Sequence, residues 1–182
     1  MHTARLAIES LHPAMERRAI VIGGGAIGLA AALALKAMGL EDVTIAEPND
    51  TRRAFLNERC GQKAVAKAEG NAPMVIDAVG YGGTRAIASE LVQPGGVIGH
   101  VGLGDSKEGL DVRRVTLQEI TFIGTYTYTA QDFRDTAAAI FDGRLGPLDW
   151  TEARPLSEGA QAFADIRAGV VAAPKIILSP WP

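Results

Sequence analysis

The chain is poor in the residues that build disulfides and metal sites. It has one cysteine, Cys60, and three histidines among 182 residues. A lone cysteine excludes an intramolecular disulfide and any cysteine-rich zinc site. His2, His12 and His100 are scattered along the chain, so we expect no zinc and no other metal ligands in this chain.

Long apolar runs and basic clusters are also missing. No run reaches the about 18 residues of a membrane span, and residues 1–12 lack the apolar core of a signal peptide. The net charge is -3 and no Lys/Arg cluster overrides it. These absences disfavour a membrane or nucleic-acid partner and favour a cytoplasmic, reducing setting.

A glycine-rich turn between two apolar strands is the strongest signal that is present. Segment 19–47 predicts a strand, a tight turn, an alanine-rich helix and a second strand. Gly23 permits the sharp turn, Gly25 lets the backbone approach a pyrophosphate, and Gly28 lets the helix lie close to the sheet. The helix N-terminus offers free N–H groups to the phosphates. This order predicts a dinucleotide-binding βαβ unit.

An acidic residue at the end of the second strand indicates which dinucleotide is bound. Glu47 stands 19 residues after Gly28, where a carboxylate accepts hydrogen bonds from the adenosine ribose and repels the 2′-phosphate of NADP. We therefore favour NAD. Arg52 could stack on adenine, but with Arg53 it could instead pair with a 2′-phosphate, so NADP stays an alternative. A solvated glutamate that binds nothing is the other interpretation of Glu47.

Strands alternate with helices along the rest of the chain. We expect a lead-in helix and link at 1–18 and a nucleotide-binding domain at 19–182, with Asp50 and Thr129 as helix N-caps. Such alternation predicts an α/β fold, a Rossmann doubly wound, mostly parallel sheet with helices on both faces. The predicted strands are 19–23, 43–47, 63–66, 74–79, 97–103, 120–126 and 175–178.

Three of these strands end in segments that contain small residues. Ala78-Val79-Gly80, Val101-Gly102-Leu103 and Gly124-Thr125-Tyr126 would leave the sheet at the edge where open α/β sheets bind ligands. They would leave room for a flat nicotinamide. Asp77 is either a contact at this edge or a turn carboxylate. His100 could carry a proton, but a packed histidine within a strand is the favoured interpretation.

Several segments, taken in order, resemble the medium-chain, alcohol dehydrogenase-like superfamily. The resemblance covers roughly residues 19–178, nearly the whole chain, and the ordered set is more specific than the glycine turn alone. The segments that carry it are Ile20–Leu29, Met74–Gly80, Leu91–Ile98, Val101–Leu103, Gln118–Tyr126 and Leu156–Phe163.

The resemblance implies a role for each residue that matches a family motif. Glu47 would hold the ribose, Arg52 the adenine side, and Val101, Gly102 and Leu103 would border the nicotinamide. The family's N-terminal, chaperonin-10-like domain, which supplies catalytic zinc ligands and a proton relay, is expected to be absent, so no catalytic residue is assigned. The pyrophosphate would be cradled by Gly23, Gly25, Ala26, Ile27 and Gly28.

The first hypothesis is therefore the NAD-binding domain of an alcohol or polyol dehydrogenase-like oxidoreductase. It would position nicotinamide for hydride transfer, with little activity toward a small alcohol or polyol unless a catalytic domain is added. A second hypothesis is a non-catalytic dinucleotide-binding or dimerising module, with the apolar edge strand 120–126 pairing across a two-fold axis. A third is an FAD-binding protein.

Overall fold

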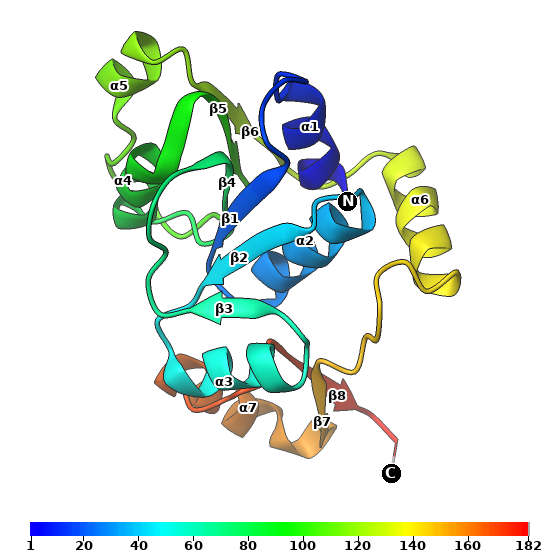
Figure 1. Ribbon diagram of the computed structural model, residues 1–182. Coiled ribbons are helices and arrows are strands. Elements are labelled where there is room, and N and C mark those ends of the chain that lie inside the picture. Colours follow the sequence, from blue (N-terminus) through cyan, green and yellow to red (C-terminus); the bar gives the residue numbers. More distant parts are fainter. Residues whose placement is uncertain (182) are drawn as a thin grey trace.

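The computed structural model describes residues 1–181 and contains a six-stranded parallel sheet. The strand order is β3-β2-β1-β4-β5-β6, which confirms the predicted doubly wound sheet (Figure 1). The order reverses between β1 and β4, and ligands bind such sheets at that switch point. The strands are β1 (Arg18–Ile22), β2 (Asp42–Ala46), β3 (Lys63–Val65), β4 (Ala72–Asp77), β5 (Val92–His100) and β6 (Thr121–Gly124).

Helices cover both faces of this sheet (Figure 1). α1 and α2 share one buried cluster with the sheet, while α4 contributes to a second cluster on the opposite face. Between β3 and β4 the described chain has no helix. The helices are α1 (His2–Ser10), α2 (Ala26–Ala37), α3 (Asp50–Glu58), α4 (Gly82–Leu91), α5 (Val112–Leu117) and α6 (Ala130–Phe141).

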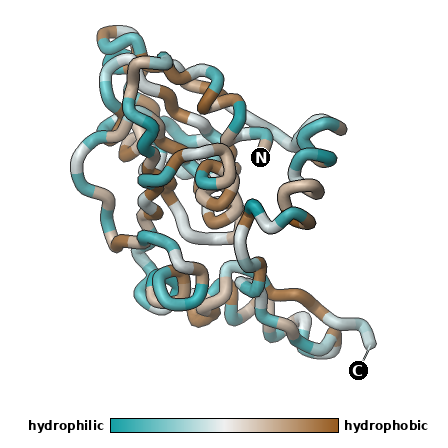
Figure 2. Tube along the Cα trace, turned by 45° about the vertical axis from the view of Figure 1, so that its right-hand side comes forward, coloured by the Kyte–Doolittle hydropathy of each residue, from teal (hydrophilic) through white to brown (hydrophobic). Residues whose placement is uncertain are grey.

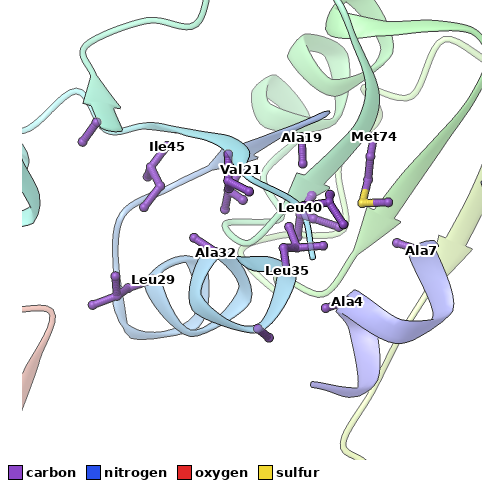
Figure 3. Packing of buried hydrophobic residues seen from close by; sticks show 14 of the residues in the cluster. Ala4, Ala7, Ala19, Val21, Leu29, Ala32, Leu35, Leu40, Ile45 and Met74 are labelled. Atoms are coloured by element: carbon purple, nitrogen blue, oxygen red, sulfur yellow. The ribbon is translucent and has the colours of Figure 1, made fainter. Parts of the chain in front are cut away.

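Small side chains allow the helices to approach the sheet closely. Ala4 and Ala7 of α1 and Ala32 of α2 are buried against the larger residues Val21 and Met74 of the central strands (Figure 3). Because β4 is buried along its whole length, it reads in the sequence as a continuous apolar run rather than an alternating one. Figure 2 shows hydrophobic residues concentrated inside this body of the molecule.

The structure differs from the sequence at several element boundaries. β5 begins at Val92 and ends at His100, so His100 lies at the carboxyl end of its strand and not in the middle. β6 stops at Gly124, two residues before the predicted end. α3 is capped by Asn49, whose side chain accepts from the backbone N–H of Arg52. The predicted N-cap Asp50 is the first residue of the helix, and α5 was not predicted.

The last elements form a separate unit beside α3 (Figure 1). β7 (Thr151–Pro155) pairs with β8 (Lys175–Ser179) in a two-stranded parallel sheet. A short 3-10 turn (Leu156–Glu158) and α7 (Gly159–Ala168) connect them. The expectation of one sheet for all strands is therefore wrong for β8, because its unpredicted partner β7 supplies the backbone hydrogen bonds.

Within residues 1–181 no helix is both long and apolar enough to cross a membrane.

Candidate functional site

The glycine turn between β1 and α2 lies at the carboxyl edge of the sheet. Gly23 adopts a φ of 94°, and its N–H donates to the carbonyl oxygen of Ala46 at 2.9 Å, which joins the turn to the end of β2. A Cβ on Gly28 would overlap the carbonyl oxygen of Gly23. A Cβ on Gly25, in contrast, would meet no atom within 4 Å. The turn is thus tightly packed against the protein at Gly28, whereas the space beside Gly25 is open.

The first turn of α2 presents unused hydrogen-bond donors. No side chain caps this helix, and its N-cap is Gly25. Among the described residues, the backbone N–H groups of Gly25, Ala26, Ile27 and Gly28 have no acceptor. Free N–H groups and the helix dipole together favour a bound anion. The open space at Gly25 is where a pyrophosphate could approach, so the residues present fit a dinucleotide.

Glu47 follows β2 and faces the glycine turn. Its Oε2 accepts from the backbone N–H of Gly24 at 2.9 Å, and its Oε1 accepts from the N–H of Asn49 at 2.8 Å. The residue is 5 % exposed. A carboxylate can accept about four hydrogen bonds, so each oxygen keeps acceptor capacity for a ribose hydroxyl. The two backbone donors fix the carboxylate beside the turn.

The two arginines of α3 have different partners. The Nη1 of Arg52 lies 3.9 Å from Oε2 of Glu47, and its Nε is buried without a hydrogen-bond partner among the described residues. Arg53 instead donates to the carbonyl oxygen of Glu47 at 3.0 Å and to Oδ1 of Asp50 at 2.5 Å. Arg52 is therefore the arginine directed toward the Glu47 carboxylate, whereas Arg53 is held by Asp50 and by the backbone just before the helix.

The segments that follow β4 and β5 pack against each other. The backbone N–H of Gly102 donates to the carbonyl oxygen of Asp77 at 3.0 Å, and that of Gly104 donates to the carbonyl oxygen of Val79 at 3.1 Å. A Cβ on Gly102 or Gly80 would overlap the backbone of the opposite segment. Leu103 is 78 % exposed at this edge. Gly80 and Gly102 thus allow the segments after β4 and β5 to pass close to each other, with Leu103 exposed beside them.

Asp77 supports this crossing from inside the protein. It is fully buried: its Oδ1 accepts from the N–H groups of Val79 and Gly80 at 3.0 and 2.9 Å, and its Oδ2 accepts from Oγ1 of Thr84 at 3.0 Å. Of the two roles considered for Asp77, this geometry is that of the turn carboxylate. Its carboxylate is directed at its own turn and at Thr84 of α4.

His100 lies next to Asp77 on the neighbouring strand. Its Nε2 is 3.6 Å from Oδ2 of Asp77 and has no hydrogen-bond partner among the described residues. Its ring packs on Phe122 with a centroid distance of 5.5 Å. These contacts are those of a packed histidine.

A largely apolar cavity of about 360 Å³ adjoins the glycine turn. Ile27 and Val101 line it from the turn and from the end of β5, and Tyr128 and Phe133 line it from the connection to α6 and from α6 itself. The cavity therefore lies next to two of the residues assigned to the cofactor.

Sequence reasoning found most of the residues that meet at this edge but missed Asn49. Its position directly before an amphipathic helix was an available signal, because Asn is among the preferred N-cap residues. In the described part of the chain, no three His, Cys, Asp or Glu residues lie close enough to hold a metal ion. The residues present therefore do not fit a zinc ion.

Known proteins share this sequence pattern and fold. A silkworm (Bombyx mori) sorbitol dehydrogenase is 27 % identical over 178 residues, which cover 87 % of this chain and 50 % of that protein. The chain spans about half the length of the curated relatives it matches. Alcohol dehydrogenase TADH from Thermus sp. ATN1 is 21 % identical with a TM-score of 0.81, over 98 % of this chain and 55 % of that one.

An acetophenone reductase from Geotrichum candidum, solved in complex with NAD, has a TM-score of 0.77 at 20 % identity, over 94 % of this chain and 51 % of that one. At this identity the structural similarity supports the fold alone. The family model described as "Zinc-binding dehydrogenase" matches residues 26–142, which is more than half of the chain. The chain therefore belongs to the zinc-binding dehydrogenase family.

Proposed function

We propose that this chain binds a nicotinamide dinucleotide at the carboxyl edge of its sheet, as the coenzyme-binding part of an alcohol or polyol dehydrogenase. The observation that carries the proposal is the uncapped start of α2, with free N–H groups beside the open face of Gly25. The cofactor supplies the hydride chemistry, and the chain supplies binding and orientation. Membership of a dehydrogenase family supports this over an FAD-binding role.

Each end of the cofactor is assigned to named residues. Glu47 accepts the ribose hydroxyls and Arg52 lies on the adenine side, while Asp77 holds the β4 turn in place. The remaining residues form two groups. Gly23, Gly25, Ala26, Ile27 and Gly28 surround the pyrophosphate, and Ala78, Val79, Val101, Gly102 and Leu103 border the nicotinamide.

We propose NAD rather than NADP as the cofactor. Glu47 is held beside the turn by two backbone donors, and its negative charge disfavours a 2′-phosphate at the same place. The Nη1 of Arg52 lies 3.9 Å from this carboxylate, so Glu47 offsets the positive charge that a 2′-phosphate would need.

A fluorescence titration of the purified chain with NADH and NADPH tests both proposals. We expect NADH to bind, and NADPH to bind at least about tenfold more weakly, a difference of about 1.4 kcal/mol. Tight binding of NADPH with weak binding of NADH would contradict the role proposed for Glu47. If neither nucleotide bound, the proposed cofactor site would be wrong, and the chain could serve only as a structural scaffold.

The groups that activate the alcohol are proposed to come from outside the residues described. Residues 1–181 offer no cluster of metal ligands, and no side chain at the nicotinamide edge is assigned as an acid or base. The chain should therefore oxidise alcohols and polyols poorly when assayed with NAD. Rapid alcohol oxidation that survives metal chelation would contradict this.

A dimerising role through β6 is a second candidate. Within residues 1–181, β6 is the last strand of the sheet and pairs only with β5, and Phe122 on it is 36 % exposed. An unpaired edge strand can join the same strand of a second copy across a two-fold axis. This role is compatible with cofactor binding, because the two sites lie on different strands.

A further inference from the structure

The C-terminal unit, residues 151–181, is held together by its own contacts. β7 and β8 pair along five residues each. Arg154 of β7 donates to Asp165 of α7 at 2.6 Å and to Glu152 at 2.6 Å. β7, β8 and α7 are therefore joined to one another by contacts of their own.

Its hydrogen bonds to the rest of the protein come from one place. Within the described residues, only two hydrogen bonds link this unit to residues 1–150, and both come from the first residues after Glu47. Asn49 Nδ2 donates to the carbonyl oxygen of Gly169 at 2.8 Å, and Arg52 Nη2 donates to that of Val171 at 3.4 Å. The unit is thus attached at the proposed adenosine end of the cofactor site.

Asn49 uses three groups to join three parts of the structure. Its backbone N–H donates to Oε1 of Glu47, its side-chain Oδ1 accepts from the N–H of Arg52, and its Nδ2 binds Gly169. The first bond fixes the ribose-binding carboxylate, the second starts α3, and the third holds the turn between α7 and β8.

The turn between α7 and β8 is shaped for this contact. Gly169 has a φ of 70°, and a Cβ on it would stand 3.3 Å from the Nδ2 of Asn49. Val171 and Ala173 of the same turn are buried although they belong to a loop. The guanidinium of Arg52 contacts both Glu47 and Val171, through Nη1 at 3.9 Å and Nη2 at 3.4 Å, so the turn meets the same arginine that lies beside the carboxylate.

We infer that Asn49 is a positioning residue that couples cofactor binding to docking of the C-terminal unit. The turn 169–173 forms a wall of the adenosine end, and a bound adenosine stabilises the docked unit. Coupling between two binding events is reciprocal, so a docked unit must tighten adenosine binding by the same factor. This inference rests on the proposed function, because it requires a dinucleotide at Glu47.

The variant Asn49→Ser separates the attachment from the helix cap. Serine caps a helix about as well as asparagine, but it has no amide to reach Gly169. We expect NADH and AMP to bind about two- to tenfold more weakly, the effect of one hydrogen bond. Asp111→Ser is the matched control, because Asp111 caps α5 by accepting from Arg114 and makes no hydrogen bond to the unit among the described residues.

Proteolysis of the wild-type chain tests the reverse direction without a variant. Arg167 and Lys175 are exposed tryptic sites on either side of the turn. AMP should slow cleavage after both residues by a similar two- to tenfold factor, whereas nicotinamide mononucleotide should not. In Asn49→Ser the protection by AMP should fall toward none.

The outcomes separate this inference from the proposed function. If the wild type binds NADH but Asn49→Ser binds NADH and AMP unchanged, the coupling is wrong and the proposed function stands. The same holds if AMP leaves the cleavage rates of the wild type unchanged. If the wild type binds neither NADH nor AMP, both proposals fall.

Discussion

Gly28 packs its α-carbon against the carbonyl oxygen of Gly23, so closely that a Cβ on Gly28 would overlap that oxygen. The contact brings the first turn of α2 onto the end of β1. The two glycines are therefore needed together: Gly23 forms the tight turn, and Gly28, which has no Cβ, leaves room for the carbonyl oxygen of that turn.

We predict that Gly28→Ala and Gly25→Ala fail in different ways. In Gly28→Ala the helix must move away from the turn, so the free energy of unfolding should fall by about 1–3 kcal/mol and NADH binding should be lost. Gly25→Ala meets no atom within 4 Å, so stability should hold while NADH binds at least about tenfold more weakly. Urea unfolding and NADH titration measure both effects.

Gly83→Ala is the control for the glycine variants. Gly83 lies in α4, and a Cβ on it would also meet nothing within 4 Å. Alanine should stabilise the chain by about 0.4–1 kcal/mol and leave NADH binding unchanged. Equal loss of binding in Gly83→Ala and Gly25→Ala would contradict a pyrophosphate site at the turn.

We predict that Glu47→Gln narrows the preference between the two nicotinamide dinucleotides. The amide keeps the size of the side chain but removes its charge, so NADPH should gain relative to NADH. One backbone N–H of Gly24 or Asn49 would face an amide NH2, which should cost about 1–3 kcal/mol of stability. Glu41→Gln, at an exposed position before β2, should change neither quantity. An unaltered NADH to NADPH ratio in Glu47→Gln would refute the assignment.

We predict an acid-sensitive contact between α1 and α6. Asp132 of α6 is 4 % exposed and accepts from the backbone N–H of Thr129 at 2.9 Å, from its hydroxyl at 2.5 Å, and from Nε of Arg5 at 3.1 Å. The hydroxyl of Thr129 above all, helped by its N–H group and by Arg5 and His2, holds the pKa of Asp132 well below its usual value of 3.8, although burial acts in the opposite direction.

The sign of this effect follows from the lowered pKa. Asp132 contributes its full stabilisation above pH 3.8, its unfolded value, and loses it as the pH falls from there toward the folded pKa. Asp132→Ala should lower stability at pH 7 by about 1–3 kcal/mol and flatten the acid limb of the stability curve. Asp135→Asn, on the exposed side of α6, should leave both the stability at pH 7 and the acid limb of the curve unchanged. Parallel acid limbs in wild type and Asp132→Ala would contradict the prediction.

We predict that the chain dimerises through β6. Sedimentation at high concentration should give a dimer. Thr121→Lys places a charge on this exposed edge strand, and lysine on an edge strand opposes pairing with another strand, so the variant should sediment as a monomer. The same charge at Thr151 of β7, also exposed, is the control. A wild-type monomer, or a dimer that survives in Thr121→Lys, would exclude pairing through β6.

Local patterns in the sequence are enough to predict much of the nucleotide-binding fold. The glycine spacing at positions 23, 25 and 28, the buried run of β4 and the alternation of strands and helices predict a doubly wound sheet and the place of its ligand edge. These features are readable because each reports a backbone or periodic requirement of its own segment. The family likewise follows from ordered short motifs, and the matching family model confirms it.

Which residues become partners across that edge follows from the three-dimensional fold and not from any local pattern. Asp77 and Glu47 both read as strand-end carboxylates, yet Asp77 is fully buried around its own turn while Glu47 faces the glycine turn. The pairing of β8 with β7, and the attachment of Gly169 to Asn49 from 120 positions away, were equally invisible in the sequence. Such contacts join residues that are far apart in the sequence. They depend on how the whole chain folds, so the local pattern of apolar and polar residues does not indicate them.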